Sequence, residues 1–136
     1  MTLRVAIAGA SGYAGGEVAR LLAGHPEFEV TTLTAHSLVG QSVEQVHPHL
    51  SSLHGQVFQP TTTDVLADHD VVVVALPHGD SGALGETLLA EGGQKVLIDL
   101  GADRRPTKIL PFFVSIVGTR VILLRYAVGT PWVFTL

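Results

Sequence analysis

The sequence predicts an α/β fold, a doubly wound and mostly parallel sheet, on two observations. Short runs rich in apolar and β-branched residues alternate with stretches of helical period, which is the order of βαβ units. The run of four valines at residues 71–74 contains no polar residue. Such a run is typical of a strand covered on both faces, as in a parallel sheet.

The composition is that of one folded domain. The 136 residues are 46% hydrophobic and 15% charged, which excludes disorder as a description of the whole chain. The formal net charge of −4 gives no electrostatic reason to expect nucleic-acid binding. There is no cysteine, which excludes disulfides, thiolate metal sites and a cysteine nucleophile on this chain. The N-terminus lacks the long apolar stretch of a signal peptide, so we expect a cytoplasmic protein.

The first third of the chain predicts a strand, a helix and a second strand. Residues 3–8 (LRVAIA) are a short apolar run closed by Gly9. Residues 13–23 place apolar side chains at helical spacing, and Gly24, His25 and Pro26 end that helix. Residues 28–33 (FEVTTL) predict the second strand.

The middle of the chain carries weaker signals. Residues 37–53 are polar without a clean period, which predicts a loop with one short helix. Residues 56–59 predict a short third strand. Residues 64–67 predict one helical turn with Asp64 as its N-cap.

Strong signals return at residue 71. Residues 71–76 (VVVVAL) predict a buried strand, and residues 81–91 predict a helix with Leu84, Leu88 and Leu89 on one face. Residues 95–100 (KVLIDL) predict another buried strand closed by Gly101.

The chain changes character after Asp103. Residues 109–117 and 121–128 are apolar and predict two strands, either a hairpin or separately buried. A membrane-spanning reading is disfavoured because Arg120 and Arg125 interrupt the apolar run. We therefore expect two parts, residues 1–103 and an atypical apolar tail at residues 104–136.

A glycine-rich loop lies between the first strand and the first helix. Its G-x-x-G-x-x-G spacing is a variant of the dinucleotide fingerprint of Rossmann-like folds, and its strand–loop–helix context favours nucleotide binding over a plain turn. Gly9 would permit the tight turn, Gly12 the close approach of a pyrophosphate, and Gly15 close packing of helix on strand. The candidate cofactor-binding residues here are Gly9, Ser11, Gly12, Tyr13, Ala14 and Gly15.

The end of the second strand predicts which dinucleotide binds. NAD sites usually carry an acidic residue there that binds the ribose 2′-hydroxyl, but no acid lies between Val30 and Val43. The absence permits NADP, and Thr34, His36 and Ser37 could donate hydrogen bonds to its 2′-phosphate. The alternative is a solvated polar loop.

Two further sets of residues include histidines. Pro77 and His78 follow the valine-rich strand, at the sheet edge where ligands bind, so His78 could line a nicotinamide pocket or merely bond to backbone. His47 and His49 do not predict a metal site, because spacing places no third ligand beside them.

Four motifs together resemble one family. GASGYAGGE at residues 9–17, HPHL at 47–50, ALPHG at 75–79 and IDLGAD at 98–103 resemble N-acetyl-γ-glutamyl-phosphate reductase, the NADP-dependent enzyme of arginine biosynthesis. The first motif alone would also fit aspartate-semialdehyde dehydrogenase, but HPHL and ALPHG favour the arginine enzyme. The tail does not match the family's continuation.

The resemblance implies reduction of an acyl phosphate. A cysteine attacks the acyl carbon, phosphate leaves, and hydride from NADPH reduces the thioester to the semialdehyde. The cysteine and an acid–base histidine belong to a second domain, so this chain resembles a truncated, cofactor-binding part in which we expect no catalytic residue. The full-length family implies a small-molecule substrate and a homo-oligomer, with no nucleic-acid or membrane partner. A stand-alone NADP-binding regulatory module, and a truncated or frameshifted product without function, are the alternatives.

Overall fold

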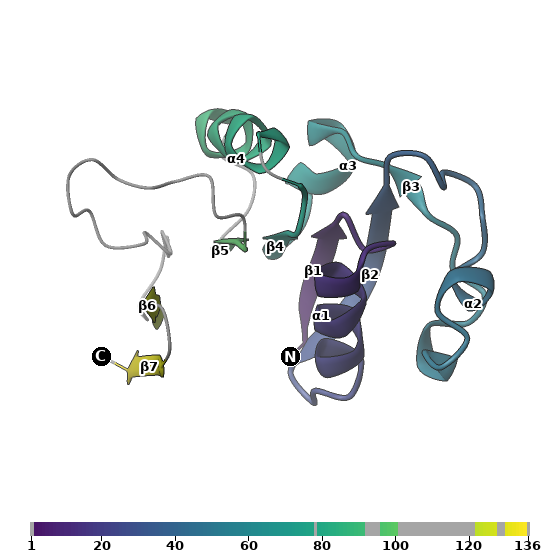
Figure 1. Ribbon diagram of the computed structural model, residues 1–136, viewed down its shortest axis with the longest axis horizontal. Helices are drawn as coiled ribbons and strands as arrows, with labels where there is room; N and C mark the ends of the chain where they lie inside the picture. Colours follow the sequence, from purple (N-terminus) through teal and green to yellow (C-terminus); the bar gives the residue numbers. More distant parts are fainter. Residues whose placement is uncertain (1, 78, 92–95, 101–121, 128–129, 136) are drawn as a thin grey trace.

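The computed structural model describes residues 2–77, 79–91, 96–100, 122–127 and 130–135 (Figure 1). Five strands form one parallel sheet in the order β3-β2-β1-β4-β5. Their bounds are Leu3–Ala8 (β1), Phe28–Ala35 (β2), Gln59–Pro60 (β3), Val71–Val74 (β4) and Val96–Asp99 (β5). The order runs outward in both directions from the β1–β4 pair, so this pair is the topological switch point of the sheet. The predicted fold class is confirmed.

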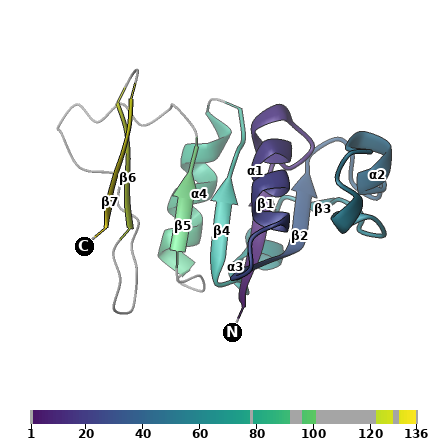
Figure 2. The same ribbon diagram turned by 90° about the horizontal axis from the view of Figure 1, so that it is seen from below.

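Helices lie on both faces of this sheet. Helix α1 covers one face, whereas α3 and α4 lie on the other (Figure 2). The bounds are Tyr13–Ala23 (α1), Val43–Val46 (α2), Thr63–Ala67 (α3) and Asp80–Glu91 (α4), with one turn of 3₁₀-helix at Ser51–Leu53. The predicted bounds of α1 are confirmed.

The alternation of side chains along β1 divides the core into two layers. Val5 and Ile7 pack on the α1 side, while Ala6 and Ala8 pack with Leu66 of α3 and Leu88 of α4 on the other side. All four side chains of β1 named here are fully buried. This burial on both faces explains why the strand has no polar alternation.

Strand β2 is longer than predicted because of its pairing with β3. Thr34 and Ala35 pair with Gln59 and Pro60, which carries the strand two residues past Leu33. The third strand therefore lies at Gln59–Pro60, at the end of the predicted range. Gln56, which was expected to begin that strand, instead donates a hydrogen bond from its side chain to the Val30 carbonyl at 2.9 Å.

Further boundaries differ, and one of them is the end of β5, which lies at Asp99 rather than at the predicted Leu100. Asp64 is not the N-cap of α3, because the helix begins at Thr63 and Thr62 occupies the cap position. Its carboxylate lies instead in the first turn, where it interacts favourably with the helix dipole. Strand β4 ends at Val74, two residues earlier than predicted, and α4 begins one residue earlier, at Asp80.

The described part of the tail forms a separate two-stranded sheet. Strand β6 (Ile122–Ala127) runs antiparallel to β7 (Thr130–Thr135). The predicted strand at residues 121–128 is thus largely confirmed, but its partner is β7, which the sequence did not predict. The other predicted strand, at residues 109–117, lies outside the described residues. No helix in the described ranges is long and apolar enough to cross a membrane.

Candidate nucleotide-binding site

The loops that follow β1 and β4 meet at the switch point of the sheet. Ala8 and Val74 are paired at the ends of these strands, and the Ala75 N–H donates to the Ala8 carbonyl at 2.8 Å. Ligands of open α/β sheets bind at such a crevice, beyond the carboxyl ends of the strands. The glycine loop after β1 is therefore placed where a nucleotide site is expected.

Two glycines of this loop are required by its geometry. Gly9 has φ of +79°, which residues with a side chain rarely adopt, and a Cβ there would lie 2.9 Å from the Ala75 carbonyl carbon. A Cβ at Gly15 would lie 2.8 Å from the Ala10 Cα, so only glycine lets α1 start this close to the loop.

The loop presents backbone N–H groups that have no partner in the part of the chain that the structure describes. The first helical hydrogen bond of α1 runs from the Gly16 N–H to the Gly12 carbonyl at 2.9 Å. No described residue accepts a hydrogen bond from the N–H groups that precede it, at Ser11, Tyr13, Ala14 and Gly15. Such groups, together with the positive end of the helix dipole, form an anion-binding site.

The space above the loop is open at Gly12. Among the residues that the structure describes, a Cβ at Gly12 would meet only the Gly9 carbonyl oxygen, at 3.6 Å. Its φ of −85° and ψ of 176° are ordinary extended values, so the turn itself does not require glycine here. Tyr13 is fully exposed. A phosphate could thus approach the N–H groups without displacing protein atoms.

The side chain of Thr34 is not exposed at the end of β2. It is fully buried, and its hydroxyl is hydrogen-bonded to the Thr61 hydroxyl at 2.8 Å. Because β2 pairs with β3, the Thr34 side chain lies in the protein interior. Its hydroxyl links β2 to Thr61, the residue that follows β3. Its backbone supports the loop instead, because the Ala10 N–H donates to the Thr34 carbonyl at 2.9 Å.

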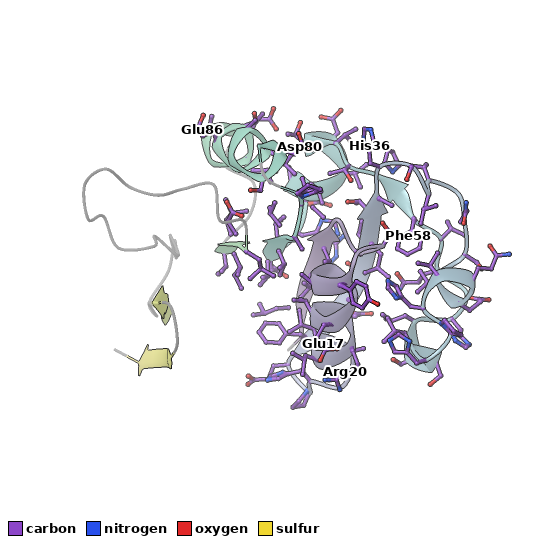
Figure 3. All side chains as sticks on the ribbon, viewed as in Figure 1. Glu17, Arg20, His36, Phe58, Asp80 and Glu86 are labelled. Atoms are coloured by element: carbon purple, nitrogen blue, oxygen red, sulfur yellow. The ribbon has the colours of Figure 1, made fainter. Side chains whose placement is uncertain are left out.

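His36 and Ser37 are exposed just beyond the end of β2. Figure 3 shows His36 at the same edge of the sheet as Asp80, which begins α4. Pro77 is also exposed at this edge, whereas His78 lies outside the described residues. The structure therefore brings the loops after β1, β2 and β4 to one edge.

Sequence reasoning missed one residue beneath the glycine loop. His47 Nε2 lies 2.8 Å from the Ala10 carbonyl oxygen, across 37 residues of sequence. The HPHL motif was the available signal, but it does not indicate a contact partner. Within the described ranges, no group of three or more His, Asp or Glu side chains could hold a metal ion.

A salt bridge lies on the exposed face of α1. The Arg20 Nε donates to Glu17 at 2.9 Å, and this hydrogen bond lowers the pKa of the Glu17 carboxyl and raises that of the Arg20 guanidinium. Figure 3 shows the two side chains together on the helix. Arg20 thus balances the negative charge that lies nearest to the glycine loop on α1.

A groove of about 220 Å³ lies elsewhere, along the outer side of β2. Its walls are Thr31, Thr32, Leu33, Gly55, Gln56, Val57 and Gln59. None of the predicted cofactor-binding residues lines it. A ligand that binds in this groove would contact different residues from one that binds at the glycine loop, so an experiment can distinguish the two locations.

Comparison with known proteins agrees with this geometry. Residues 4–124 match the family model described as semialdehyde dehydrogenase, NAD binding domain. N-acetyl-gamma-glutamyl-phosphate reductases from Micrococcus luteus and Streptomyces avermitilis are 54% and 53% identical over 105 residues, which are 77% of this chain. The chain spans 30% of the length of each.

The solved structures show the same fold. Aspartate semialdehyde dehydrogenase from Candida albicans, crystallised with NADP, superposes with a TM-score of 0.67 at 24% identity. The superposition covers 82% of this chain and 33% of that protein.

Proposed function

Because the chain belongs to the semialdehyde dehydrogenase family, in its NAD-binding domain, we propose that it is the NADP(H)-binding part of an N-acetyl-γ-glutamyl-phosphate reductase. One observation carries the proposal. The glycine loop at the switch point presents the N–H groups of Ser11 and of the first turn of α1 without protein partners in the described structure. The similarity to the reductases of Micrococcus luteus and Streptomyces avermitilis supports the choice of reductase.

The proposed pyrophosphate site is made of backbone. The N–H groups of Ser11, Tyr13, Ala14 and Gly15 hold the phosphates, while Gly9 shapes the turn and Gly12 leaves room for the ligand. When bound, NADPH supplies the hydride that reduces the acyl group. The chain's own residues bind and orient the dinucleotide, and none of them forms a bond to the substrate.

The 2′-phosphate and nicotinamide are proposed to lie at the neighbouring loops. His36 and Ser37 are exposed donors for the 2′-phosphate, and Thr34 contributes only through its support of the loop. Pro77 and His78 are proposed to flank the nicotinamide. The domain is proposed to comprise residues 1–103, with residues 104–136 as a tail, in a cytoplasmic homo-oligomer when full length.

Calorimetric titration with NADPH and NADH tests the proposal. We expect NADPH to bind about tenfold more tightly or better, because hydrogen bonds to a charged phosphate stabilise more than neutral ones. Ser37→Asp should weaken NADPH selectively through like-charge repulsion. Ser52→Asp makes the same charge change at an exposed residue of the 3₁₀ turn and should leave both affinities unchanged.

Two results would contradict the proposal. Equal or reversed affinities for the two dinucleotides would exclude the 2′-phosphate site at His36 and Ser37. No binding of either dinucleotide by the folded chain would exclude the cofactor role and leave a product without function of its own.

A further inference from the structure

We propose that His47 is a positioning residue of the glycine loop, which turns the Ser11 N–H toward the cofactor; this rests on the function proposed above. His47 Nε2 lies 2.8 Å from the Ala10 carbonyl oxygen. Because a carbonyl oxygen only accepts hydrogen bonds, His47 donates from Nε2. Nε2 therefore carries a proton in this arrangement.

The His47 ring is held in one position by its packing. A Cβ at Gly16 would lie 2.6 Å from Cε1 and 2.9 Å from Nε2 of the ring, so the ring occupies the space that any side chain at this position would need. On another side it meets the buried Phe58 ring edge to face, with centroids 6.3 Å apart. The position of the His47 ring is therefore fixed by two features, the missing side chain at Gly16 of α1 and the aromatic ring of Phe58.

The backbone of His47 is held as well. Its N–H donates to the Val43 carbonyl at 2.7 Å, and its own carbonyl accepts from the Leu50 N–H at 3.0 Å. His47 thus ends α2 with both backbone groups bonded. Because the backbone of His47 is fixed, its ring holds the Ala10 carbonyl at a defined position relative to α2.

The geometry of a trans peptide gives this contact its consequence. In the planar unit that joins Ala10 to Ser11, the carbonyl and the N–H point in opposite directions. His47 binds the Ala10 carbonyl, so the Ser11 N–H of the same peptide unit points away from the His47 ring, and no described residue accepts a hydrogen bond from it. The Ala10 N–H is bonded to the Thr34 carbonyl, which fixes the preceding peptide unit too.

The preorganised N–H group should matter for the pyrophosphate alone. His47→Phe keeps an aromatic ring but removes the donor, so the Ala10–Ser11 peptide becomes free to rotate. We expect the affinity for NADPH and for 2′-phospho-ADP-ribose to fall by about three- to tenfold, which is the range for one hydrogen bond. The affinity for adenosine 2′-phosphate, which lacks the pyrophosphate, should stay unchanged.

Three further variants separate positioning from folding. His47→Gln retains an N–H donor near the position of Nε2 and should restore most of the affinity. Gly16→Ala should displace the ring and reproduce the loss seen in His47→Phe, without adding to it in the double variant. His49→Phe is the matched control, because His49 is exposed and touches the His47 ring but has no hydrogen bond to the loop.

Amide spectra of the ¹⁵N-labelled full chain complete the test. In the absence of ligand, His47→Phe should shift the Ser11 resonance and speed its hydrogen exchange, while His49→Phe should not. Equal losses for NADPH and adenosine 2′-phosphate would show a merely structural role and overturn the proposal. So would full NADPH affinity in both His47→Phe and Gly16→Ala. Failure of the unsubstituted chain to bind NADPH would instead overturn the proposed function.

Discussion

Gly9 and Gly12 stand three residues apart in one loop, yet the structure gives them different reasons to be glycine. Gly9 has a positive φ and no room for a Cβ, whereas Gly12 has an ordinary backbone conformation and open space. Gly12→Val should therefore leave the chain folded and abolish NADPH binding, because the side chain would cover the N–H groups. Calorimetry with circular dichroism of the same sample measures both effects.

Gly9→Ala is the counterpart at the same loop. It should lower the free energy of unfolding by at least about 1–2 kcal/mol, the cost of a left-handed conformation for a residue with Cβ. The contact with Ala75 adds to that cost.

Retained NADPH affinity in a folded Gly12→Val variant would mean that the loop is only a turn.

At the residue scale, the local sequence pattern predicted the glycine loop but not the contacts from Thr34 and His47 that hold it. Gly9 and Gly15 could be assigned from their spacing after a strand, and the structure places them as expected. The side chain of Thr34 is buried because β3, which lies 25 residues later, pairs with it. The bond from His47 to Ala10 is also formed between distant segments. The sequence pattern around either residue does not contain its partner.

At the scale of elements, boundaries that depend on local signals were predicted, whereas boundaries that depend on pairing between distant segments were not. Helix α1 was predicted to its exact residues because Gly12 precedes it and Gly24 and Pro26 follow it, so its stop signals are local. Strand β3 has two residues, too few to show a period, and its bounds follow from pairing with β2. The start of α3 was misplaced by one residue because Thr62, Thr63 and Asp64 are all acceptable N-caps.

The link between α2 and the turn before β3 predicts a dependence of stability on pH. Glu44 Oε2 accepts a hydrogen bond from the Gly55 N–H at 3.1 Å, and this bond, with one from the backbone N–H of Glu44 itself, lowers the pKa of the carboxyl from its ordinary value. A carboxyl with a lowered folded-state pKa stabilises the fold above its unfolded pKa. This stabilisation disappears as the pH falls through the folded pKa.

Glu44→Gln should remove that contribution. The variant should unfold at a lower temperature than the parent chain at about pH 6, and the difference should shrink toward about pH 3. Thermal unfolding followed by circular dichroism measures it. Glu27→Gln is the control, since the Glu27 side chain is exposed and accepts no hydrogen bond from a described residue. A gap between the Glu44 variant and the parent chain that does not change with pH would contradict the assignment.

At the scale of the whole molecule, the sheet order was foreseeable in type but not in detail. Alternation of strands and helices predicts a parallel sheet, while the order β3-β2-β1-β4-β5 depends on pairings between distant segments. The split at residue 103 stays a prediction. The pairing of β6 with β7 was not predicted, because Pro131 lies in the second strand and weakens its signal.

The whole chain should be inactive as a reductase on its own. The thioester step that the family resemblance implies needs a positioned thiolate, and these 136 residues contain no cysteine. The assay is phosphate-dependent reduction of NADP by N-acetylglutamate semialdehyde, with the Micrococcus luteus relative as the positive control. Turnover above background, by protein free of host enzyme, would contradict this expectation.

Mapping the bound dinucleotide onto the chain by NMR tests the cofactor role most directly. NADPH is titrated into the ¹⁵N-labelled chain, and the amide shifts are followed residue by residue. We expect the largest shifts at Ser11 and at Tyr13–Gly15, with further shifts at His36 and Ser37. Shifts confined to the groove along β2, at Thr31–Leu33 and Gly55–Gln59, or no shifts at the glycine loop at saturating NADPH, would contradict it.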